Sequence, residues 1–138
     1  MKQILRNIAR VSYIDARILQ DMTVIPGMGA ILGDDFNFIS LPIVGLAGCE
    51  VTSRNDDRVP TFTSVLTCLL SEDFDPANRP IVFLLVTLQG ERYLLGHQEP
   101  PFPIISSVSS LPAKMSEPSG YRLTAQWSST LGLLRLLE

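Results

Sequence analysis

Apolar residues in this chain occur in short runs, several of them alternating with polar residues, and turn-forming residues close most runs. This pattern is typical of antiparallel β-structure, whose strands are short and often buried on one face. Long stretches with helical spacing are largely missing. The sequence therefore predicts a mainly β fold, either an antiparallel sandwich or a partly open barrel. We expect strands at residues 17–25, 36–40, 43–53, 61–70, 80–88, 92–96, 104–111 and 121–127.

The N-terminal segment departs from this pattern. Ile4, Leu5, Ile8 and Val11 recur at the spacing of one helical face. The pattern becomes strand-like only at residues 12–14. We therefore allow for a short N-terminal helix before the first strand.

The clearest local signal is a hairpin at residues 80–96. Residues 80–88 are rich in β-branched and aromatic side chains, which favour a central strand. Gln89-Gly90 then provides a residue that tolerates the positive φ of a tight turn. Residues 92–96 resume an extended run, so the two strands should pair.

A proline-rich connector follows this hairpin. Pro100, Pro101 and Pro103 lack the N–H groups that a sheet ladder requires, so they cannot lie inside a sheet. We expect residues 99–103 to run extended along a sheet edge or across a sheet end, and residues 104–111 to form an edge strand.

Composition narrows the possible partners. The chain has 138 residues, which is the size of one domain with its own core, and we expect residues 1–138 to form a single domain. Charged residues make up 18%, below the typical share of about 25%, so some apolar surface can face a partner. A net charge of −3 and scattered basic residues argue against nucleic acid and anionic membranes as partners.

The sequence pattern predicts no targeting signal. No apolar run approaches the roughly 20 residues of a membrane-spanning helix, and the N-terminus lacks the features of a signal peptide. We therefore expect a cytoplasmic protein. Cys49 and Cys68 have apolar neighbours and are interpreted as reduced, buried thiols, although a bridge between neighbouring strands stays open if the protein is exported.

No motif for catalysis or metal binding emerges. His97 is the only histidine, and no motif around a serine or cysteine supports its use as a base. Gly27, Gly29 and Gly33 miss the spacing of a phosphate-binding loop, because Leu32 stands where the third glycine belongs. Acidic residues cluster only in expected loops. The sequence predicts no enzyme, no cofactor and no metal site.

Aromatic residues offer a binding alternative. Tyr93, Phe102, Tyr121 and Trp127 could form a platform for a sugar or for a single strand of nucleic acid, although the net negative charge argues against nucleic acid. Tyr121, Leu123, Ala125 and Trp127 also alternate along one strand face, which suits core packing better.

The second half of the chain shows an ordered series of features from about residue 61 onward: a β run, then Gly90-Glu91-Arg92-Tyr93-Leu94-Leu95-Gly96, then the three prolines, then Gly120-Tyr121-Arg122-Leu123-Thr124. In this series the chain resembles small β-structured proteins from the tail or baseplate modules of prophage-like elements in gut bacteria. The resemblance implies a structural assembly subunit, associated with a virion and without an active site. It carries over no functional residue.

The C-terminus is rich in leucine, and these residues are candidates for an interface: Leu131, Leu133, Leu134, Leu136 and Leu137. A tail exposed to solvent would not tolerate so many leucine side chains, so we expect other parts of the protein or a partner to cover them. The tail either completes the protein's own core or docks on a neighbouring subunit. We expect a non-enzymatic structural protein that forms a homo-oligomer or binds other structural proteins. The alternative is a small-molecule or glycan-binding β domain that uses Tyr93, Phe102 and Trp127.

Overall fold

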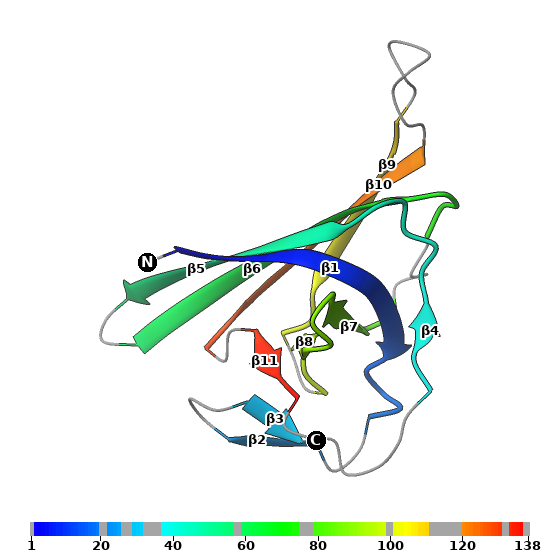
Figure 1. The fold of residues 1–138 in the computed structure, drawn as a ribbon. Coiled ribbons are helices and arrows are strands. Elements are labelled where there is room, and N and C mark those ends of the chain that lie inside the picture. Colours follow the sequence, from blue (N-terminus) through cyan, green and yellow to red (C-terminus); the bar gives the residue numbers. More distant parts are fainter. Residues whose placement is uncertain are drawn as a thin grey trace.

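The computed structural model describes residues 2–19, 22–25, 29–31, 37–56, 59–74, 79–98, 101–110, 120–130 and 133–136. Within these ranges the chain is mainly β, as predicted, and contains no helix (Figure 1). The strands of the described part are β1 Lys2–Asp15, β2 Thr23–Ile25, β3 Gly29–Ile31, β4 Ile39–Ser40, β5 Ala47–Asp56, β6 Val59–Leu70, β7 Ile81–Thr87, β8 Arg92–Leu95, β9 Ile104–Ser110, β10 Gly120–Ser129 and β11 Leu134–Arg135.

Most of these strands belong to one antiparallel sheet. Its order is β11-β8-β7-β1-β5-β6-β10-β9, with β4 attached to β1, while β2 and β3 form a separate ribbon. The sheet curls so that β7 and β8 lie below β1, β5 and β6 in the view of Figure 1, and its end strands β11 and β9 do not pair. This arrangement agrees with the predicted sandwich or partly open barrel.

The N-terminal segment is a strand, so the predicted short helix is wrong. The inward-facing residues Leu5, Ile8 and Val11 are three apart because the strand register shifts twice, between Leu5 and Ile8 against β5 and between Ile8 and Arg10 against β7. Each shift is an irregularity of the β-bulge type, which adds one residue and brings the next side chain back to the same face. The bulged strand thus imitates the spacing of a helix.

The same irregularities let β1 serve both halves of the sheet. Its first part pairs with β5 and its second part with β7, and Ile8 pairs with both Ala47 and Thr87 at the change of partner. Asn7 lies in the first irregularity with a φ of 60°. Asparagine is among the residues that tolerate this left-handed conformation best.

The predicted β7–β8 hairpin is confirmed. β7 ends at Thr87 and β8 begins at Arg92, and Gly90 adopts a positive φ of 89° in the turn between them. The N–H of Gly90 donates to the carbonyl of Thr87 at 3.0 Å. Glycine is needed here because the turn requires this backbone conformation.

Several other predicted strands differ in their bounds from the observed ones. The strand expected at residues 36–40 is reduced to β4, with residue 36 outside the described residues. The strand expected at residues 17–25 shrinks to β2, because the chain first turns, with the N–H of Ile18 donating to the carbonyl of Asp15 at 3.0 Å. The strand expected at residues 43–53 starts only at Ala47 but continues to Asp56, so the connection to β6 is shorter than predicted.

The core lies on both sides of the β7–β8 part of the sheet. Consecutive residues of a strand point to opposite faces, yet Val82 and Phe83 are both buried, as are Leu94 and Leu95. The curled sheet covers one face. The β2–β3 ribbon lies next to β11 through a parallel bridge between Ala30 and Leu136, and it helps to cover the other face.

Candidate interaction edge

Trp127 belongs to the core. It lies on β10 with an exposed fraction of 1%, and its indole Nε1 donates to the carbonyl oxygen of Pro101 at 3.0 Å. Tyr121, Leu123, Ala125 and Trp127 share the inner face of β10, as their alternation predicts. In this conformation Trp127 offers no ring face to a ligand.

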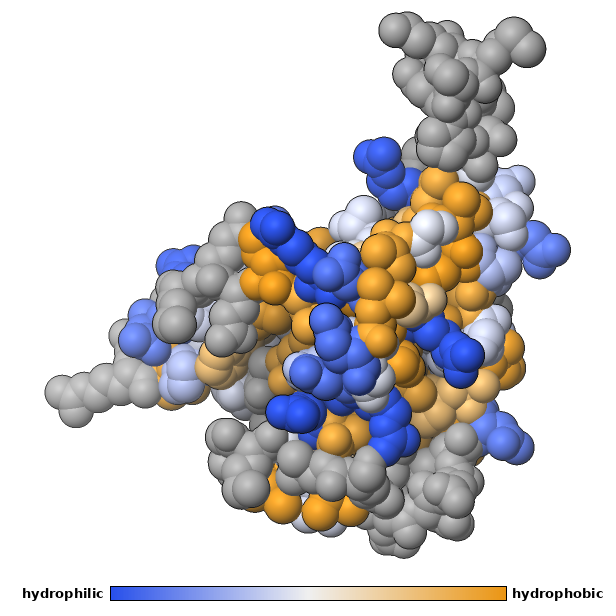
Figure 2. Space-filling model, viewed as in Figure 1, coloured by the Kyte–Doolittle hydropathy of each residue, from blue (hydrophilic) through white to orange (hydrophobic). Residues whose placement is uncertain are grey.

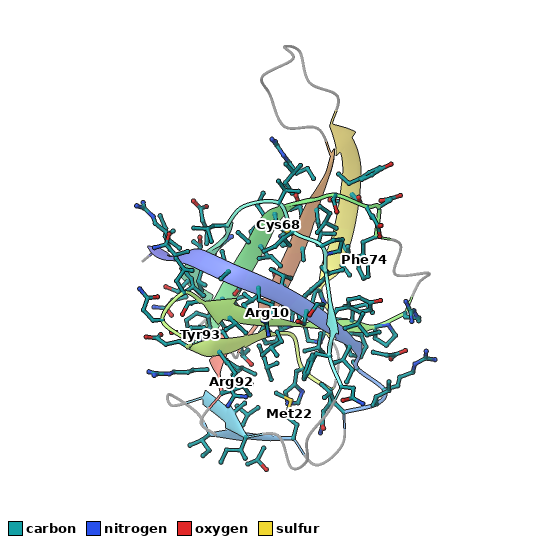
Figure 3. The ribbon with its side chains drawn as sticks, turned by 45° about the vertical axis from the view of Figure 1, so that its right-hand side comes forward. Arg10, Met22, Cys68, Phe74, Arg92 and Tyr93 are labelled. Atoms are coloured by element: carbon teal, nitrogen blue, oxygen red, sulfur yellow. The ribbon has the colours of Figure 1, made fainter. Side chains whose placement is uncertain are left out.

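Tyr93 and Phe102 lie elsewhere and are only partly buried. Tyr93 is on β8, with β7, β1, β5 and β6 between it and β10 in the sheet order. Its hydroxyl donates to Oε2 of Glu91 at 2.6 Å, and this bond raises the pKa of Tyr93, with burial adding to the effect. Figure 3 labels Tyr93 beside Arg92 on this strand. Phe102 packs against the core from the connector after β8.

The described C-terminal leucines belong to the chain's own core. Leu134 pairs with Leu94 of β8, Leu136 bridges to Ala30, and both leucine side chains are buried. Leu133 is partly buried against the same core. For Leu134 and Leu136 the predicted interface is therefore corrected in favour of intramolecular packing, whereas Leu131 and Leu137 lie outside the described residues.

His97, the two cysteines and the acidic residues of the described part do not form a metal-binding arrangement. Among the residues that the structure describes, no group of three or more His, Cys, Asp or Glu side chains could hold a metal ion. His97 follows β8 and is partly buried. Cys49 and Cys68 are free, buried thiols on β5 and β6, as the sequence predicts for a reduced protein.

The proline connector is anchored to the core and delivers the chain into β9. The bond from Trp127 to Pro101 fixes its first described residue, and Pro103 is buried near Gly96, where a Cβ atom would lie 3.4 Å from the Pro103 Cδ. Proline also restricts φ, so little conformational freedom is left in this segment. The start of β9 is thus held in place.

A second anchor holds the middle of β9. The hydroxyl of Ser107 donates to Oδ1 of Asp73 at 2.9 Å. Phe74, the residue after Asp73, is labelled in Figure 3. It is buried against Tyr13, with ring centroids 4.6 Å apart, and its ring centroid lies 6.3 Å from that of Phe83. The connection between β6 and β7 therefore ties β9 to β1 and β7.

β9 has an open edge. It pairs with β10 over all seven residues, and no other strand in the described part pairs with it. Every second residue of an edge strand points its N–H and C=O away from the sheet. β9 contains no charged residue and no proline, and Ile104 at its start is 74% exposed. Charged residues and prolines, two of the devices that usually block edge pairing, are therefore absent from this strand.

The other end of the sheet is different. β11 has only two residues, and the bridge from Leu136 to Ala30 continues its outer side into the β2–β3 ribbon. A short, covered edge is a poor template for pairing with another chain. Of the two sheet ends, β9 is the longer one, and within the described residues its outer edge has no pairing strand.

An exposed apolar area lies between β4 and β5. Ile39, Val44 and Leu46 are all exposed, and the N–H of Val44 donates to the carbonyl of Leu69 at 2.7 Å, which places the segment beside β6. Figure 2 shows apolar side chains on the viewed face in this part of the molecule. The area adds to the apolar surface that the low charge content predicts.

The sequence predicts that residues 104–111 form an edge strand, and β9 confirms this for residues 104–110, while residue 111 lies outside the described residues. The interface predicted from the sequence is the C-terminal tail and not this strand. The signal for this strand was the uncharged run Ile104-Ile105-Ser106-Ser107-Val108-Ser109-Ser110 after three prolines. Leucine density alone does not distinguish an interface from intramolecular packing, and in the structure Leu134 and Leu136 are buried within the chain.

Comparison with known proteins leaves this picture as it stands. No family model, no curated protein and no solved structure matches the chain. Within the described ranges, no helix has the length and hydropathy needed to cross a membrane.

Proposed function

We propose that this protein is a non-enzymatic structural subunit that assembles with other proteins through the open edge of β9. The observation that carries the proposal is the combination of the length of this edge, its lack of charge and the lack of a pairing strand for it within the described residues. Extended chains bind such edges by main-chain hydrogen bonds.

The anchoring of β9 supports the same proposal. An edge that is already held in the bound conformation loses little entropy on pairing, so a larger part of the contact energy appears as affinity. Trp127 and Asp73 provide this preorganisation at two points along the chain, at Pro101 before β9 and at Ser107 in its middle. A phage-tail-like subunit, as the resemblance implies, is one form that such an assembly protein can take.

The alternative function, binding of a small molecule or glycan, has less support. Of its three residues, Trp127 is enclosed, while Tyr93 and Phe102 are partly buried on different segments. A ligand of this class should raise the melting temperature of the protein. A sugar panel that leaves the melting temperature unchanged would count against it.

A variant pair tests the proposed function. Ser106 and Thr67 are exposed residues, both paired with Thr124 of β10, Ser106 from the edge strand and Thr67 from the strand on the other side. Ser106→Lys places a charge at the edge, and Thr67→Lys places the same charge two strands away. In native extracts of the source cell, we expect Ser106→Lys to release the protein from its assembly and Thr67→Lys to leave it bound. An assembly that is unchanged by Ser106→Lys would overturn the proposal.

A further inference from the structure

We infer that the partner of the β9 edge is a second copy of this chain, with the two β9 strands antiparallel about a two-fold axis. This inference rests on the proposed function and names the partner. The resulting dimer would carry one continuous sheet across both molecules.

The geometry of an edge strand permits this pairing. In an antiparallel pair, both strands offer the same alternation of N–H and C=O groups, so two identical edges complement each other. A register centred on Ser107 pairs the complete strand, Ile104 with Ser110 of the second copy and Ile105 with its Ser109. The two-fold axis then stands perpendicular to the sheet, and the outer face of one molecule continues into the outer face of the other.

The charge pattern favours an identical partner. In a two-fold contact, a charged residue near the axis lies close to its own copy, and like charges on neighbouring strands destabilise pairing. β9 has no charged residue along its whole length. A strand that selects a different, charged partner would instead be expected to carry complementary charges.

The exposed apolar surface at the start of β9 also favours pairing of the two edges. Ile104 is the most exposed of the large apolar residues in the described part. Pairing of the two edges would place Ile104 beside a neighbouring strand and remove part of its side chain from water. The anchors at Pro101 and Ser107 leave the outward edge free for this contact, because both act from the inner side of the sheet, which Trp127 and Ser107 face.

The contact would be small. Seven paired residues bury less surface than the roughly 1,200 Å² typical of stable complexes, so the dimer should be weak on its own. Sedimentation velocity should therefore cover protein concentrations up to on the order of 1 mM. We expect the weight-average mass to rise from monomer toward dimer across this range.

Charge reversal at one position gives the decisive test. In the register centred on Ser107, the two copies of residue 106 are diagonal neighbours, within reach of long side chains. Ser106→Lys and Ser106→Glu should each weaken self-association by roughly fivefold, because each places like charges together. A 1:1 mixture of the two variants should associate more tightly than either alone. Thr67→Lys, the matched control, should associate like the wild type.

The outcomes separate the two proposals. A wild type that stays monomeric throughout the range, a mixture without rescue, or equal weakening by Thr67→Lys would each overturn self-pairing. The melting temperatures of all variants show whether any substitution impairs folding. Tighter association in the mixture of the two variants cannot result from impaired folding. A monomeric wild type whose native assembly is still lost in Ser106→Lys overturns self-pairing alone. An intact native assembly in Ser106→Lys overturns the proposed function as well.

Discussion

At the scale of single residues, the two thiols illustrate how burial controls reactivity. Burial, with repulsion from Glu50, raises the pKa of Cys49 from 9.0 to about 12, and burial raises that of Cys68 to about 11. Thiolates are the reactive form, so both cysteines should resist iodoacetamide at pH 8 in the folded protein. Mass spectrometry should show slow labelling without denaturant and full labelling in urea. Rapid labelling of the native protein would contradict the burial.

The same two groups predict how stability depends on pH. Their pKa values are higher in the folded state than in the unfolded chain, so their contribution is complete below about pH 9. It is lost as the pH rises toward 11 and 12, because the unfolded thiols ionise first. The urea midpoint should therefore fall above pH 9. In the double variant Cys49→Ala, Cys68→Ala, this fall should be smaller, and an identical fall would assign it to other groups.

The side-chain hydroxyl of Ser64 is buried without a hydrogen bond in the described part of the chain. Its side chain is completely buried on β6, and its Oγ has no hydrogen-bond partner in the part of the chain that the structure describes. Removing an unsatisfied buried polar group recovers its desolvation penalty, so Ser64→Ala should stabilise the protein by about 1 kcal/mol. Urea unfolding measures the change. Ser107→Ala, which removes a bonded hydroxyl, serves as the control and should not stabilise; a loss of stability in Ser64→Ala would show a missed partner.

At the scale of the elements, the irregularity at Asn7 determines the course of β1. Its positive φ is unfavourable for most residues and worst for β-branched ones. Asn7→Val should destabilise the protein by about 1–2 kcal/mol, whereas Asn7→Gly should be close to neutral. Thermal unfolding of both variants provides the measurement. Equal stability of the valine and asparagine proteins would mean that the strand can run without this bend.

Sequence patterns predict an element well when the element depends on residues that are close together in the chain. The β7–β8 hairpin depends on residues that are neighbours in the sequence, and Gly90, with its positive φ, indicates the turn. The two register shifts in β1 depend on β5 and β7, which lie far along the chain. Helical spacing at Leu5, Ile8 and Val11 therefore had two explanations, and only the pairing partners could choose between them.

At the scale of the whole molecule, the C-terminal leucines act as part of the fold. A chain that ends at Thr130 loses the buried side chains of Leu134 and Leu136 and uncovers β8. Since a fully buried leucine contributes about 1.5–3 kcal/mol, the truncated chain should lose several kcal/mol of stability. Circular dichroism with urea should show an early or absent unfolding transition. A truncated protein that is as stable as the full chain would contradict the packing of the tail into the core and would favour the tail as an interface.

The sequence by itself determined the fold class, the β7–β8 hairpin, the edge character of residues 104–110 and the inward face of β10. These features follow from backbone preferences and from the alternation of apolar residues, which act over a few neighbouring positions. Trp127 was recognisable as a core residue for the same reason.

Only the tertiary structure decided which contacts close the molecule. It placed the bulges of β1, joined Trp127 to Pro101, buried Leu134 and Leu136 within the chain, and covered the β11 end of the sheet while leaving β9 open. Each of these depends on residues that are distant in the sequence and meet only after the sheet has curled. No local sequence pattern specifies these long-range contacts. Many strand pairings are compatible with the same alternation of apolar and polar residues, and side-chain packing selects one of them.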